Sequence, residues 1–200
     1  KRFLENIMRP LLEDCKAGKR DLQFMDASHF VFGSFVCVLW CLFRKWMRAA
    51  SGRQRHNVLG ALHATTHQIT TIVNDTYVNA ETVCELLRKL RMQAAPGRLI
   101  TVVLDNAKYH TCDLVKKCAA ECFIDLCFLP SYSPNLNLIE RYWKYVKRTC
   151  LYGKYYADFN AFKSAIDACI HNSLFKDKEK LDTLLTLNFQ SFENAQLYAA

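Results

Sequence analysis

Residues 99–105 read LITVVLD, a run of apolar and β-branched residues that ends in an acid. An unbroken apolar run of this length predicts a strand that is buried on both faces, as in the parallel part of a sheet covered by helices. The strand delivers Asp105 at its carboxyl end. Because ligands of such sheets gather at the carboxyl ends of strands, Asp105 is the first candidate for a functional residue.

The segments on either side of this strand predict further elements of an α/β fold. The pattern of apolar residues, with Gly and Pro at the breaks, predicts a lead-in helix followed by strands at 22–26, 57–63 and 68–73, the last two forming a hairpin. A crossover helix at 79–92 precedes the strand at 99–104. After it we expect a helix at 111–120, a strand at 124–129, a turn at 130–134, a helix from about 138 and helices from 155 onward.

This order of elements predicts a mixed central β-sheet, an antiparallel meander plus parallel strands, flanked by helices. We expect one domain overall: a lead-in helix over 1–20, a catalytic core over 21–150 and C-terminal helices over 151–200 packed on the core. The apolar and then basic segment over 31–55 has no clear pattern, and its structure and role stay open.

Composition limits the classes of protein that fit. The 27 Lys and Arg residues exceed the 19 Asp and Glu residues, giving a net charge of +8 that suits a polyanionic partner such as nucleic acid. The ten cysteines contain no Cys-x-x-Cys pair, so we expect reduced thiols and not a zinc site. The most apolar stretch, residues 35–43, is too short to span a membrane. We expect a cytoplasmic or nuclear protein that is not secreted, and a chain that opens on Lys1 suggests part of a longer one.

A second acid, Asp26, also follows a β-prone run, and a third, Glu140, lies near the start of the helix after Pro134. If the first and fourth strands are neighbours, Asp26 and Asp105 lie side by side at one edge of the sheet. Carboxylates that meet in this way suit a divalent cation such as magnesium. Two such ions would activate the attacking oxygen and stabilise the leaving oxygen of a displacement at phosphorus.

Two motifs carry a resemblance to a known family. Residues 102–110 read VVLDNAKYH and residues 129–143 read LPSYSPNLNLIERYW, with 34 residues between Asp105 and Glu140. With FMDASHF at 24–30, they resemble the mariner-type superfamily of DDE transposases, particularly its bacterial insertion-sequence branch. The resemblance continues from NVLGAL at 57–62 to LLTLNF at 184–189. Ser131, Asn135 and Leu138 stand where that family usually has Pro, Asp and Pro.

The resemblance implies an RNase H-like fold and a DNA transposase catalytic domain. It implies that Asp26, Asp105 and Glu140 are both the catalytic residues and the ligands of two Mg²⁺ or Mn²⁺ ions. It further implies double-stranded DNA, the element ends and the target, as substrate, and a homodimer assembled on DNA. Relatives usually carry helix-turn-helix modules ahead of this domain. The residues before Phe24 are too few for one, so we expect sequence-specific recognition to be missing from this chain.

Other residues are expected beside the three acids. Asn106 and His110 are active-site neighbours, with His110 ordering the loop after Asp105 or packing beside the site. Candidate DNA contacts are the basic residues that could meet phosphates: Arg53, Arg55, Lys108, Arg141, Lys144, Lys147 and Arg148. Taken as a charge run alone, these residues would form a solvated face.

Each acid also has a purely structural interpretation. Asn137 and Glu140 have the spacing of a helix N-terminal capping box, and an acid after a strand is often only a turn former. Two other functions remain as alternatives. The chain could be a catalytically idle transposase remnant that binds DNA or other subunits, or a general RNase H-like nuclease that cuts without joining.

Overall fold

The computed structural model describes residues 2–33, 43, 54–131 and 133–189. It contains a five-stranded sheet with the strand order β3-β2-β1-β4-β5. The strands are β1 (Arg20–Val31), β2 (Arg55–His63), β3 (Ile69–Asn74), β4 (Leu99–Leu104) and β5 (Ile124–Phe128). β1 pairs antiparallel with β2 and parallel with β4, so the central strand joins the meander to the parallel part of the sheet. The predicted mixed sheet is therefore confirmed.

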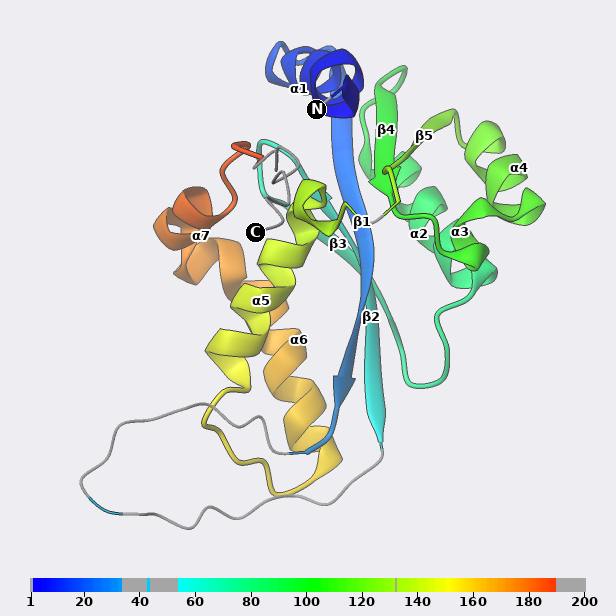
Figure 1. The fold of residues 1–200 in the computed structure, drawn as a ribbon. Coiled ribbons are helices and arrows are strands. Elements are labelled where there is room, and N and C mark those ends of the chain that lie inside the picture. Colours follow the sequence, from blue (N-terminus) through cyan, green and yellow to red (C-terminus); the bar gives the residue numbers. More distant parts are fainter. Residues whose placement is uncertain (1, 34–42, 44–53, 132, 190–200) are drawn as a thin grey trace, which may run out of the picture.

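Helices cover both faces of the sheet (Figure 1). One face carries α2 (Ala80–Gln93), α3 (Lys108–Thr111) and α4 (Asp113–Glu121), and the other carries α5 (Leu138–Cys150), α6 (Phe159–Lys176) and α7 (Lys178–Leu184). A π-helical turn η1 (Leu4–Met8) leads into α1 (Arg9–Lys16), and a 3₁₀ turn η2 (Pro134–Leu136) precedes α5. None of the described helices is long and apolar enough to cross a membrane.

Two hydrophobic cores lie on the two faces. Alternate residues of β1 point to opposite sides, as the pleat of a strand requires. Phe24 and Phe30 pack with Trp143 and its neighbours in the core beneath α5 and α6. Met25 packs in the other core with Leu87 and other residues of α2 and α4. Asp26 and Asp105 have the same parity as Phe24 and Val103 in their strands, so they belong to the face that α5 covers.

The predicted elements differ from the structure at three places. The first strand does not end at Asp26 but continues to Val31, because β2 pairs with it from Gln23 to Val31. The helix predicted at 111–120 is divided at Cys112 into α3 and α4. Helix α6 begins at Phe159, four residues later than the predicted helical segment. Most of the segment over 31–55, including Arg53, lies outside the described residues.

Eight of the ten cysteines are described, and all eight are free thiols. Five of them are buried and pack as small apolar side chains. Cys37 and Cys41 lie outside the described residues.

Candidate active site

The pairing of β1 with β4 brings two of the three acids together. Phe24 is the partner of Val103 and is the last residue of β1 paired with β4. Continuing this register by two residues places Asp26 opposite Asp105, on the same face of the sheet. Asp26 therefore lies inside β1 but beyond the end of β4, where β1 has no β4 partner.

The third acid comes from the helix on that face. Glu140 is in the first turn of α5, which packs on β1 and β2. Asp26, Asp105 and Glu140 all line one pocket of about 340 Å³, together with Asn106, Asn137 and residues of the turn at 129–133. The structure thus brings together the three acids that the sequence analysis selected. Within the described residues, no three His, Cys, Asp or Glu side chains are close enough to hold a single metal ion.

The three carboxylates influence one another electrostatically. The pKa of Asp26 is raised to about 7, mainly by burial and also by the charges of Asp105 and Glu140, while a hydrogen bond from the Ala27 amide opposes the rise. Burial also raises the pKa of Glu140, partly offset by Lys144. A pocket that disfavours its own negative charges has the donor chemistry of a divalent-cation site, because hard oxygen ligands of like charge are stabilised by such an ion.

Asp105 differs from the other two acids because His110 holds it. The Nδ1 of His110 lies 2.7 Å from the Oδ1 of Asp105, and the Ala107 amide donates to the same oxygen at 3.1 Å. The bond from His110 is the main reason why the pKa of Asp105 lies below its usual value. His110 is fully buried, and its Nε2 has no hydrogen-bond partner among the described residues. The histidine therefore orders the carboxylate and the loop after β4.

Two asparagine side chains tie the neighbouring segments together. Asn106 donates from Nδ2 to the carbonyl oxygen of Leu129 at 2.6 Å, linking the end of β4 to the turn after β5. Asn137 donates from Nδ2 to the carbonyl oxygen of Met25 at 3.1 Å, linking α5 to β1. Asn137 makes no side-chain cap of α5, so the capping box that the spacing suggested for Glu140 is not formed.

The basic candidates fall into different environments. Lys144 is exposed and lines pockets on both sides of Glu140, and Lys147 lines one of them together with Asp26 while lying over the Phe30 ring. Arg141 instead donates to the carbonyl oxygens of Thr186 and Asn188. Three further candidates are exposed, away from these contacts: Arg55, Lys108 and Arg148.

Two contributions to the site were missed from the sequence. Gly60 is the partner of Asp26 in the β1–β2 pairing, and a Cβ there would lie 2.8 Å from the Trp143 ring of α5. A side chain at this position would push away the helix that carries Glu140. Tyr109 packs edge-on against the His110 ring, and burial together with the charges of Asp105 and Asp26 raises the pKa of Tyr109 to about 12. An isolated Gly in a β-prone run was the only available signal for the first, and Tyr109 had none beyond its place in the motif.

Comparison with known proteins agrees with this geometry. A family model described as DDE superfamily endonuclease matches residues 44–163, more than half of the chain. The chain belongs to this family. The description of this family agrees with the class that the sequence motifs indicated. No curated protein sequence matches the chain significantly.

Solved structures extend the likeness over nearly the whole fold. The chain is similar to the Mos1 mariner paired-end complex with Mn, with a TM-score of 0.64 and 14% identity over 94% of this chain and 62% of that one. It is also similar to the pre-cleavage Mos1 transpososome, with a TM-score of 0.64, 13% identity and coverage of 96% and 63%. This chain therefore spans about three fifths of the Mos1 chains, and the predicted RNase H-like fold is confirmed.

Proposed function

We propose that this chain is the catalytic domain of a DNA transposase and that Asp26, Asp105 and Glu140 carry its chemistry. The observation that supports this most is the convergence of three carboxylates from β1, the end of β4 and the first turn of α5 on one pocket. They belong to different elements, separated by up to 114 positions in the chain. Local turn or cap chemistry does not account for such a convergence, since Glu140 lacks the capping box and Asp26 lies within a strand.

The same three residues are the proposed ligands of two Mg²⁺ or Mn²⁺ ions. Magnesium keeps several waters and is held by one or two carboxylates plus substrate phosphates, so a DNA-free pocket need not bring three carboxylates into contact. The bound ions would supply an activated attacking oxygen and stabilisation of the leaving oxygen at phosphorus. Asp105 is held in one orientation by His110, whereas Asp26 must give up a proton before it can act as a ligand.

The proposed substrate is double-stranded DNA, bound along α5. Lys144 and Lys147 follow Glu140 by one and two turns of α5, and both line pockets that include Glu140. Their position supports contacts to the DNA phosphates on either side of the phosphate that reacts. The similar Mos1 structures are a strand transfer complex, a pre-cleavage transpososome and a paired end complex with Mn. We propose that this chain also acts on paired DNA ends, as a homodimer on DNA that provides one active site for each element end.

Cutting and joining together test this function. We expect the protein with Mg²⁺ or Mn²⁺ to nick duplexes taken from the two sides of its reading frame, and to join the freed 3′ ends to a second DNA. Chelation of the metal should abolish both steps. Cutting without joining would favour the RNase H-like nuclease, and DNA binding without cutting would favour the idle remnant. Sedimentation of the DNA complex measures the proposed dimer, which a single chain per pair of ends would contradict.

A further inference from the structure

Asn137 connects Asp26 and Glu140, the two acids that His110 does not contact. Its side chain donates to the carbonyl oxygen of Met25, the residue before Asp26. Its own carbonyl oxygen accepts from the backbone amide of Glu140 at 3.2 Å. One residue thus reaches the immediate neighbour of Asp26 through its side chain and Glu140 through its backbone.

The hydrogen bonding of Asn137 is unusual for its position. An asparagine at a helix N-cap normally turns its side-chain oxygen to an amide of the first turn, a cap worth about 1 kcal/mol. Here that cap is absent, and the side-chain oxygen is buried without a partner among the described residues. A buried oxygen left without a donor costs about 1–3 kcal/mol. The local stability of α5 therefore does not explain this orientation.

The bond to Met25 falls at the place where β4 stops pairing with β1, while β2 continues to pair with the other edge of β1. Phe24 is the last residue of β1 that pairs with β4, and Met25 is the next. Asn137 is only 3% exposed, and it lines the same pocket as the three acids. From the residue before α5, its amide adds a contact to β1 on the side where the pairing with β4 has ended.

We propose that Asn137 is a positioning residue that sets the separation between Asp26 and Glu140, and that its unpartnered oxygen accepts a hydrogen bond from a water in the pocket. This inference rests on the proposed function, because a fixed separation of these carboxylates matters only where they share a ligand. Groups that orient metal ligands from behind typically contribute about 10–100-fold to metal affinity.

The matched control is Asn79, the N-cap of α2. Its side chain accepts from the Thr82 amide at 2.9 Å in a capping box, far along the chain from the acids. Serine caps helices about as well as asparagine but is too short to keep the contact that Asn137 makes with Met25. Asn79→Ser should therefore leave metal binding unchanged, whereas Asn137→Ser should weaken it while α5 stays folded.

Titration of each protein with Mn²⁺, followed by calorimetry, tests the proposal. We expect about tenfold or greater loss of affinity in Asn137→Ser, none in Asn79→Ser, and circular dichroism unchanged in both. Without metal, the carboxyl ¹³C resonances of Asp26 and Glu140 should move in Asn137→Ser alone. Wild-type affinity together with unmoved resonances in Asn137→Ser would overturn the inference. Absence of Mn²⁺ binding by the wild type would count against the proposed function, while moved resonances would still support the positioning role.

Discussion

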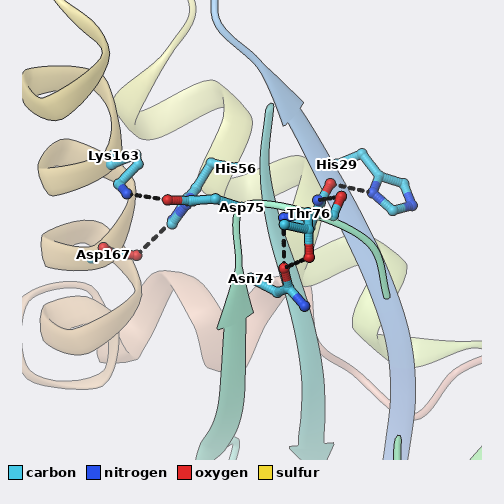
Figure 2. A network of polar contacts seen from close by, with 8 residues as sticks. His29, His56, Asn74, Asp75, Thr76, Lys163 and Asp167 are labelled. Carbon is cyan, nitrogen blue, oxygen red and sulfur yellow. Dashed lines mark hydrogen bonds and ion pairs between the residues drawn. The ribbon is translucent and has the colours of Figure 1, made fainter. Parts of the chain in front are cut away.

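Two groups of acids beside a buried histidine can be compared in the described part of the chain, and they differ in how their negative charge is balanced. In the first, His56 contacts Asp75 at 3.2 Å and Asp167 at 2.9 Å, while Lys163 lies 2.5 Å from Asp75 (Figure 2). Each carboxylate there has a hydrogen-bonding partner, and the bond from Lys163 lowers the pKa of Asp75. This cluster joins β2, the loop after β3 and α6, and its contacts account for it as a structural tie.

In the second cluster, His110 serves only one of three acids. Asp26 and Glu140 form no ion pair within the described part of the chain, and burial raises the pKa of both. Like charges gathered without compensation reduce the stability of a fold, so such a group points to function when it lines a pocket. The comparison indicates that unbalanced negative charge marks a functional site better than the number of acids beside a histidine does.

The largest effect is expected on DNA cleavage, which should depend on the second cluster and not on the first. Asp105→Ala should reduce metal-dependent DNA cleavage by at least about 10³-fold, because a bound metal contributes several kcal/mol at the transition state. The fold should be kept, since the Asp105 side chain is 52% exposed, but buried His110 loses its partner and stability should fall by about 1–3 kcal/mol. Asp26→Ala and Glu140→Ala should behave alike in the cleavage assay.

Asp167→Ala in the first cluster is the matched control. It should leave cleavage unchanged but lower stability by about 1–3 kcal/mol, because it removes a partner of buried His56. Thermal unfolding and cleavage rates, measured on both variants, check the pair. An active, folded Asp105→Ala protein would contradict the assignment of the second cluster to catalysis.

Metal binding by the second cluster should depend on pH, and this effect should be smaller than the loss of cleavage in Asp105→Ala. Because the pKa of Asp26 is about 7, a metal ion must displace a proton from it below that pH. We expect Mn²⁺ affinity to rise about tenfold for each pH unit up to about pH 7 and to level off above it. Calorimetry in buffers of different ionisation enthalpy measures the protons released, and affinity that is flat between pH 5.5 and 7 would exclude Asp26 as a ligand.

The sequence predicts the fold and the identity of the acids better than their arrangement. Strand β4 and the interval from Asp105 to Glu140 are visible because an apolar run and a fixed spacing are local properties of the chain. The extent of β1 beyond Asp26 depends on pairing with β2, whose partner residues there lie 24 to 32 positions further along the chain, so the end placed at Asp26 was wrong. The structural alternative for Asn137 was wrong for a similar reason, because its bond partner Met25 is 112 positions distant.

The smallest effect is expected on stability when one charge is removed from the second cluster. This substitution should stabilise the fold, whereas most substitutions destabilise it. The folded-state pKa of Asp26, about 7, lies above its ordinary value, so the folded protein holds this proton more tightly than the unfolded chain. The contribution of Asp26 to stability therefore falls as pH rises from about 4 to about 7. Asp26→Asn removes that loss and should stabilise the metal-free protein above pH 7, by about 1 kcal/mol after solvent screening.

Thermal unfolding at two pH values measures this gain. For a chain of this size we expect the melting temperature of Asp26→Asn to exceed that of the wild type by roughly 2–4 °C at pH 7.5, and by nothing near pH 4. Saturating Mg²⁺ should reverse the order, because a ligand stabilises only the protein that binds it. Asp167→Asn, in the compensated cluster, should lower the melting temperature at pH 7.5 with or without Mg²⁺. A gain in Asp26→Asn that persists at pH 4, or that survives Mg²⁺, would mean that its cause is packing and not the unbalanced charge of a metal site.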